Sequence, residues 1–227
     1  MATTGKWATR STGKPITAPS GLGRWSGLCF LGKHDKKLAI RTAYRSPRQQ
    51  PTGGYGFFDQ QYALLLSQGV KKPNVRKQFI KDMTAAVNKV QSDGYEIILS
   101  LNVNETIGQD KTDGIASLME SCTLQDLHML SASAPPATYK YGTACCIDCM
   151  LGSASIAENV CKAGYLAYDE GFFSKDRGLF VDSDFQALMG SVESILPTAA
   201  RGIRSEDQPS VDKYLAAFKT YADDHHL

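Results

Sequence analysis

One short apolar block restricts the fold of this chain more than any other feature. Residues 96–104 read EIILSLNVN, and a nearly continuous apolar run of this length is typical of a strand covered on both faces. Before this block, apolar residues recur at spacings of three and four, which predicts an amphipathic helix with Asn74 as its N-cap. The recurring residues are Val75, Phe79, Met83, Val87 and Val90. A helix followed by a buried strand favours a layered α/β fold.

Length and composition limit the classes of protein to which the chain can belong. Its 227 residues suffice for one domain with an appendage, and 42% apolar residues can fill a sizeable core. A net charge of +2 argues against a protein coated in basic residues. The sequence has no run of about 18 apolar residues, and residues 1–10 lack the apolar stretch of a secretory signal. We therefore expect an intracellular protein, cytoplasmic or nuclear, that is not secreted and has no membrane partner.

The other predicted elements complete one domain and a separate helix. Two strands, at 24–31 and 37–44, are expected to form a hairpin, and the prolines and glycines of 46–56 indicate a loop. Further elements are expected as helices at 57–67 and 115–122, a hairpin or long strand at 138–152, and a strand at 178–184. We expect an irregular segment at 1–23, one domain at 24–204, and a C-terminal amphipathic helix at 205–227 with Ser210 as its cap.

Six cysteines include one pair with the spacing of a metal or redox site, Cys146 and Cys149. Side chains alternate between the faces of a strand, so these two residues would point in opposite directions if the segment is a strand. No second pair of ligands completes a four-ligand zinc set. We therefore expect buried, reduced cysteines with a structural role.

Polar motifs follow the predicted strand ends in a fixed order. They are Asn102-Val103-Asn104-Glu105, Gln125-Asp126-Leu127-His128, Ala137-Thr138-Tyr139-Lys140, Cys146-Ile147-Asp148, and the segment from Ser174 to Asp182. This order resembles the endonuclease/exonuclease/phosphatase superfamily, in particular the endonuclease-like domains that precede the reverse transcriptase of retroelements. The family's typical motifs are Asp-x-Asn-Glu, Thr-Tyr, Arg-Ile-Asp and Ser-Asp-His-Arg. The resemblance extends over residues 3–225 and includes the segments Gly23-Arg24-Trp25-Ser26, Ala43-Tyr44-Arg45, Gln60-Gln61-Tyr62 and Arg76-Lys77-Gln78-Phe79.

The resemblance implies a layered α/β sandwich of the endonuclease/exonuclease/phosphatase type. In that family, carboxylates at strand ends hold a divalent cation through oxygen ligands. The cation neutralises phosphate charge and prepares the attacking water. An Asp accepts or directs the proton of that water, and a His held by another Asp contacts the phosphate.

Residue by residue, the match to these motifs is incomplete. Asn104 and Asp148 match, but Asn102 stands where the family has an Asp, and an amide has neither charge nor useful basicity. In the last motif, Lys175 occupies the Asp position and Asp176 the His position. A competing alignment uses 183–185, which restores an Asp but loses the His. The family's metal-binding Glu and its first Asn come from early strands, and residues 1–25 contain neither residue type.

The resemblance with these substitutions predicts a domain that is shortened at its N-terminus and degenerate as a nuclease. Asn102, Asn104, Asp148, Lys175 and Asp176 would be vestigial catalytic positions. We expect a protein that acts by binding rather than as an enzyme, with no cofactor. Two alternatives remain: an active Mg²⁺-dependent phosphodiesterase or endonuclease, and a structural or assembly protein without a role in nucleic-acid biology.

Two further features suggest partners. A basic group that would contact the phosphates of DNA or RNA consists of Lys71, Lys72, Arg76, Lys77, Lys81 and Arg177, although most of it could equally be a solvated helix face. The final helix carries an apolar stripe of Val211, Tyr214, Leu215, Phe218 and Tyr221. Together with a sheet edge left exposed by the missing strands, this helix is expected to support self-association or a protein partner.

Overall fold

The computed structural model describes residues 10–13, 15–106, 114–130, 135–141, 146–168, 170, 175–190 and 207–225. The chain divides into two compact units, Met1–Ser191 and Val192–Leu227, and each is treated by itself below. Among the described residues, no helix is both long and apolar enough to span a membrane.

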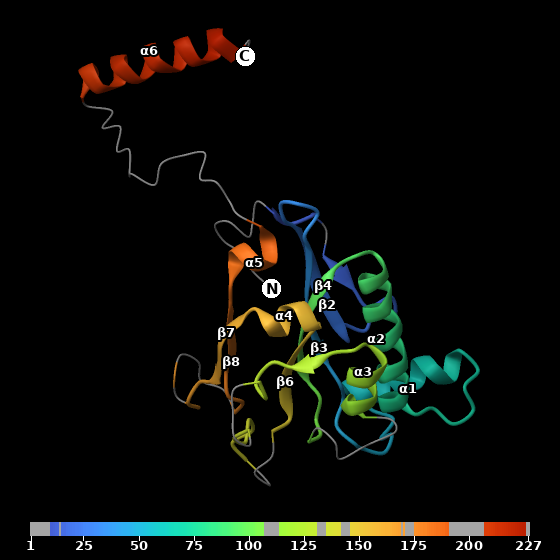
Figure 1. Cartoon of the computed structure of the whole chain (residues 1–227). Helices are drawn as coiled ribbons and strands as arrows, with labels where there is room; N and C mark the ends of the chain where they lie inside the picture. The colour runs from blue at the N-terminus through green and yellow to red at the C-terminus, as the bar shows by residue number, and fades with distance from the viewer. Residues whose placement is uncertain are drawn as a thin grey trace. The chain divides into compact units, whose positions relative to one another are not determined.

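A six-stranded mixed sheet forms the centre of the first unit (Figure 1). Its strands, in spatial order, are β1 (Ile16–Thr17), β2 (Trp25–Leu31), β3 (Lys37–Tyr44), β4 (Glu96–Asn102), β6 (Asp148–Gly152) and β5 (Gln125–Asp126). The hairpin expected from the sequence is confirmed by the antiparallel pairing of β2 with β3. Strands β3 and β4 run parallel, so their C-terminal ends lie at the same edge of the sheet.

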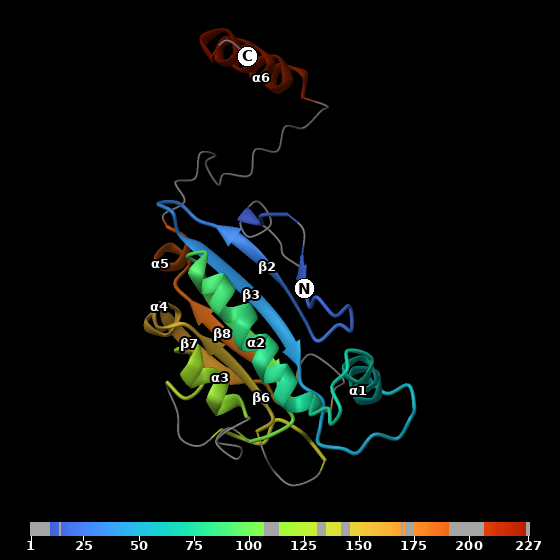
Figure 2. The same cartoon turned by 90° about the vertical axis from the view of Figure 1, so that its right-hand side faces the viewer.

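Helices cover one face of this sheet (Figure 2). They are α2 (Val75–Ser92) and α3 (Ile115–Ser121), while α1 (Phe57–Ser67) packs beside α2. The expected N-cap of α2 is confirmed, because the side chain of Asn74 accepts a hydrogen bond of 2.9 Å from the backbone N–H of Lys77. Alternate residues of β4 point to this face and join its core, which includes Ile97, Leu99, Leu101, Phe79, Met83, Val87, Leu118, Cys149 and Leu151.

A smaller layer covers part of the opposite face. It contains a two-stranded sheet of β7 (Val160–Tyr165) and β8 (Leu179–Ser183), with α4 (Ala154–Glu158) and α5 (Phe185–Met189) (Figure 1). Its core consists of Phe30, Leu38, Leu127, Ile156, Leu188 and Met189. The strand expected at 178–184 is present as β8. It lies outside the central sheet and pairs with β7, a strand that was not predicted from the sequence.

The two faces of the central sheet are covered unequally. On the helical face, Ile97 and Leu99 are completely buried. On the other face, the neighbouring side chains Ile98 and Ile40 are only half-buried, and Tyr44 is 39% exposed. Every residue of β7 and β8 is also half-buried or exposed. The second face therefore contributes less apolar burial to the stability of the domain.

The second unit contains one described helix, α6 (Gln208–His225). It begins at Gln208 rather than after Ser210, so the expected cap is wrong. Within this helix, the rings of Tyr214 and Phe218 stack with centroids 6.3 Å apart. Taken by itself, the helix exposes an apolar stripe of Tyr214, Leu215, Phe218 and Tyr221.

Candidate functional site at the strand ends

The register of the central sheet places three polar or aromatic residues in one row. Tyr44 of β3 is paired with Asn102 of β4, and Asn102 is paired with Asp148 of β6. Paired residues on neighbouring strands direct their side chains to the same face. The adjacent Leu101 and Cys149 belong to the helical core, so this row lies on the less covered face. The strand expected at 96–104 is confirmed as β4, and β6 lies within the segment 138–152 that was expected to form a hairpin or long strand.

Asp148 is the central charged group of this row. Its carboxylate accepts hydrogen bonds from the side chains of Thr138 and Asn102, and both bonds lower its pKa. Burial outweighs them and, helped by the negative charge of Asp176, raises the pKa of Asp148 above its ordinary value. Two buried oxygens, Asn102 Oδ1 and Asp148 Oδ2, have no hydrogen-bond partner.

Backbone contacts bring the last motif to this row. Tyr139 and Asp176 form an antiparallel bridge, and the N–H of Arg177 donates to the carbonyl of Thr138 over 2.8 Å. Thr138 is completely buried, and its hydroxyl accepts a bond of 2.9 Å from the N–H of Ile147. The structure therefore gathers Asn102, Asp148 and Asp176. Ser174 lies outside the described residues.

Two of the expected site residues point elsewhere. Lys175 is exposed, and its Nζ lies 5.8 Å from the centre of the Tyr141 ring. Asn104 has a left-handed backbone with a φ of 49°, and its Nδ2 donates to the carbonyl of Arg45 over 2.7 Å. Asn, unlike most residues, adopts this conformation at low cost, and here the conformation turns the amide towards the end of β3.

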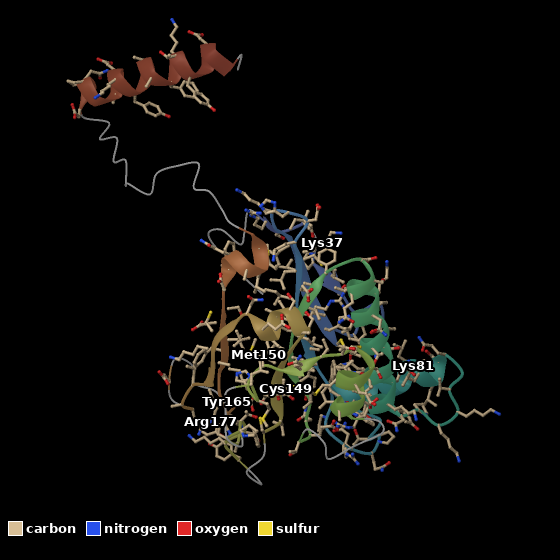
Figure 3. All side chains as sticks on the ribbon, in the orientation of Figure 1. Lys37, Lys81, Cys149, Met150, Tyr165 and Arg177 are labelled. Carbon is tan, nitrogen blue, oxygen red and sulfur yellow. The ribbon has the colours of Figure 1, made fainter. Side chains whose placement is uncertain are left out.

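The six basic residues expected to bind phosphates do not form one surface. Figure 3 shows Arg177 on the side of β7 and β8 and Lys81 on the far side, on α2. The Arg177 guanidinium donates to the carbonyls of Ala137 and Leu166, at 3.0 and 3.2 Å, and lies 4.2 Å from the centre of the Tyr168 ring. Arg177 therefore has a structural role between the 137–140 segment and the loop after β7.

Arg76 belongs to a buried ion-pair network around Glu105. Glu105 Oε2 lies 2.5 Å from Arg45 Nη1 and 2.6 Å from Arg76 Nη2, and all three side chains are less than 10% exposed. Glu105 Oε1 accepts a bond of 2.7 Å from the N–H of Ile115 at the start of α3. The network ties the ends of β3 and β4 to α2 and α3. These residues stand in the family-like segments of the sequence, but their separation along the chain conceals that they meet.

A basic cavity of about 800 Å³ opens beside this network, at the same edge of the sheet. It lies between the 45–51 segment, α1 and the start of α2. Five of its residues are cationic, and no Asp or Glu of the described chain lines it. The lining residues are Arg45, Arg48, Gln49, Gln50, Pro51, Phe58, Tyr62, Lys72, Pro73, Asn74, Val75, Arg76 and Lys77. Burial, together with the positive charges of Arg45 and Arg48, lowers the pKa of Arg76 despite its bond to Glu105.

The residues at the strand ends do not fit a tight site for the divalent cation that such a fold implies. Hard cations are held by oxygen ligands that carry charge, and the two oxygens without partners belong to one amide and one carboxylate. Across the described segments, no cluster of three or more His, Cys, Asp or Glu side chains is arranged to hold a metal ion.

His128, Cys146 and Cys149 have structural positions, whereas Cys161 is exposed, so the expectation of buried cysteines is wrong for that residue. His128 is 3% exposed, its Nε2 lies 3.1 Å from the carbonyl of Gly164, and its ring packs on Tyr165. Cys149 is buried in the helical core, and Cys146 Sγ donates to the carbonyl of Asp148 over 3.1 Å. The five cysteines in the described residues are all free thiols, so the described part of the chain contains no disulfide.

Comparisons with known proteins identify the fold. No protein-family model matches the sequence, and no curated protein matches it. The endonuclease domain of TRAS1, a telomere-specific non-LTR retrotransposon, is similar in structure with a TM-score of 0.50 at 10% identity, over 76% of this chain and 69% of that domain. The 3′ phosphatase NExo from Neisseria, bound to a product DNA hairpin, is similar with a TM-score of 0.50 at 12% identity, over 76% of this chain and 72% of that one. The chain therefore has the mixed α/β fold of the endonuclease/exonuclease/phosphatase proteins.

Proposed function

We propose that this protein binds nucleic acid at the basic cavity and does not cleave it. The observation that carries the proposal is the charge of the cavity, which presents cationic side chains at the strand-end edge of a nuclease-type fold. Backbone phosphates supply most of the affinity between proteins and nucleic acids, and Lys and Arg are the residues that neutralise them. The N-terminal end of α2 also lines the cavity, and its helix dipole favours negative charge.

Within the cavity, Lys72 and Lys77 are the proposed phosphate contacts. Both are exposed, whereas Arg45 and Arg76 are buried and hold Glu105. The guanidinium groups of Arg45 and Arg76 share one carboxylate, so the buried group keeps a net positive charge. This charge would attract phosphates at longer range without direct contact. Lys71 and Lys81 are exposed as well, but they do not line the cavity, so we assign them at most a minor contribution.

Without a tight cation site, the strand-end row lacks the means to activate water. Loss of a general base typically costs about 10²- to 10⁴-fold in rate. Here the neutral amide of Asn102 stands where the resembling family has an aspartate. We therefore propose that the protein uses no divalent-metal cofactor.

Binding can be tested by fluorescence anisotropy with labelled oligonucleotides at several salt concentrations. We expect the affinity to fall steeply with salt, and Lys72→Ala combined with Lys77→Ala to weaken binding and reduce the salt slope by about 1 for each phosphate that the variant no longer neutralises. Lys89→Ala is the matched control, since Lys89 lies at the other end of α2 in an exposed pair with Asp93. Equal losses in both variants, or no binding at all, would contradict the proposal.

An active phosphodiesterase is the second candidate function. The observation in its favour is the meeting of Asn102, Asp148 and Asp176 with two oxygens that lack partners. Nicked, abasic and single-stranded substrates should be incubated with the protein in Mg²⁺ and in Mn²⁺. Our proposal predicts negligible cleavage; robust turnover that Asp148→Ala abolishes would establish the second candidate instead.

A further inference from the structure

We infer that the nucleic acid preferred at the basic cavity is single-stranded. This inference rests on the proposed function and specifies its ligand: unpaired nucleotides whose phosphates enter the cavity and whose bases stack on tyrosines beside it. The relevant juxtaposition is one chain segment, 45–51, that lines the cavity and has an exposed tyrosine close to each of its ends.

The first tyrosine, Tyr55, stands on a loop that is held in place. Buried Asp59 of α1 accepts two bonds of 2.8 Å from Thr52, one from its N–H and one from its hydroxyl. These bonds lower the pKa of Asp59. The side chain of Gln60 donates to the carbonyl of Tyr55 itself over 2.7 Å. Three side-chain bonds thus fix the short path from the cavity wall to Tyr55.

On this loop, Tyr55 is 96% exposed. Fully exposed aromatic rings gain nothing from burial, so this ring contributes little to the stability of the domain. Its neighbours Gly53, Gly54 and Gly56 carry no side chain that could cover either face of the ring. Tyr55 follows the lining residue Pro51 by four positions, a reach of at most about 14 Å along an extended chain. The ring is therefore available to a ligand that extends out of the cavity.

The second tyrosine, Tyr44, directly precedes the lining residue Arg45. It is 39% exposed, and its ring contacts Phe57 edge to face with centroids 5.1 Å apart. This contact holds the orientation of the ring, and the register of β3 places the residue beside Asn102. Tyr44 and Tyr55 thus lie close in the chain to the two ends of the cavity-lining segment 45–51.

Basic grooves combined with aromatic side chains are the usual means of holding unpaired nucleotides. Every base has a face that can stack, but a duplex keeps these faces inside and offers only its phosphates. Stacking on Tyr55 and Tyr44 would therefore add affinity for a single strand and none for a duplex. Unpaired DNA and unpaired RNA share this chemistry, so the experiment includes both.

The test measures binding of the full chain by anisotropy with three 12-nucleotide probes: oligo-dT, oligo-U and a blunt DNA duplex. We expect both single strands to bind more tightly than the duplex at equal salt. Tyr55→Ala should weaken single-strand binding about five- to a hundred-fold and leave duplex binding unchanged. Tyr55→Phe should retain the affinity, because the ring and not the hydroxyl makes the contact. Tyr141→Ala, a change of another exposed tyrosine that does not line the cavity, is the control and should have no effect.

The outcomes separate this inference from the proposed function. Duplex binding that is at least as tight as single-strand binding, or a Tyr55→Ala effect that is equal for all probes, would overturn the inference. If such duplex binding still depends on Lys72 and Lys77, the proposed function stands. Absence of binding to every probe would overturn both. Tyr44→Ala provides an independent second variant, and its expected effect is also confined to the single strands.

Discussion

Asn102 and Asp148 are direct partners across β4 and β6, and the amide of Asn102 donates a hydrogen bond to the carboxylate of Asp148. The amide group thus supports a buried carboxylate where a second carboxylate would repel it. Because Asp176 already adds negative charge nearby, the neutral residue at position 102 limits the charge that accumulates at the strand ends.

Asp148→Asn should make the free energy of unfolding less dependent on pH. The pKa of Asp148 is raised in the folded protein, so the folded state binds this proton more tightly than the unfolded chain does. The resulting cost in stability is absent below the ordinary pKa of 3.8 and grows until the pH exceeds the folded pKa. The free energy of unfolding of the variant, minus that of the native protein, should therefore be more favourable at pH 7 than at pH 4. For a half-buried group we expect this change to be at most about 1 kcal/mol. Urea denaturation of both proteins at pH 4, 5.5 and 7 measures this difference. If the variant is destabilised relative to the native protein more at pH 7 than at pH 4, the prediction is wrong.

Glu105→Gln should destabilise the domain strongly. It leaves the guanidinium groups of Arg45 and Arg76 buried together without the carboxylate they share. Removing one partner of a buried ion pair typically costs about 3–5 kcal/mol. The free energy of unfolding in urea provides the measurement. As a control, Asp93→Asn breaks the exposed pair with Lys89 and should cost less than about 1 kcal/mol. Similar losses in the two variants would show that the network contributes no more than a surface pair.

Asn102→Asp should create a response to magnesium that the native chain lacks. The substitution places two carboxylates side by side, with Asp176 close to them, and charged oxygens are what Mg²⁺ requires. We expect the melting temperature of the variant to rise with Mg²⁺ through preferential binding to the folded state, while the native protein changes little. Without Mg²⁺, the variant should melt below the native protein because of charge repulsion. If Mg²⁺ raises the melting temperature of the native protein as much as that of the variant, the native residues do bind the cation and the prediction is wrong.

Deletion of residues 206–227 should abolish an association or lower solubility. The deleted segment contains α6, whose stripe of Tyr214, Leu215, Phe218 and Tyr221 is apolar and lies along one side of the helix. Such a stripe is normally buried against a partner surface. Light scattering of the full and shortened chains over a range of concentrations tests this expectation. Identical mass and solubility would mark the helix as dispensable for association.

Elements with a strong local period could be predicted from the sequence. The long α2 follows from its spacing and its Asn74 cap, β4 from its unbroken apolar block, and the β2–β3 hairpin from its two apolar runs. The shorter β7, α4 and α5 were missed, because five or six residues are too few to show a period and their positions depend on tertiary contacts.

The candidate site was predictable only in part. The ordered motifs correctly indicated that Asn102, Asp148 and Asp176 would meet. They gave no indication that Glu105 would bind two arginines from distant segments, since ion pairing has no sequence period. Nor did they indicate the cavity, which depends on how the 45–51 segment packs against α1 and α2.

The unequal burial of the two sheet faces also bears on the order in which the domain opens. Amide exchange is slowest where apolar cover is deepest, which here is β4 beneath α2. A two-stranded ribbon such as β7–β8 has little stability of its own and would exchange first. The backbone bonds that carry Asp176 to Thr138 adjoin this ribbon, whereas Asn102 and Asp148 belong to the central sheet. Transient opening would therefore release Asp176, while Asn102 and Asp148 stay paired in the central sheet.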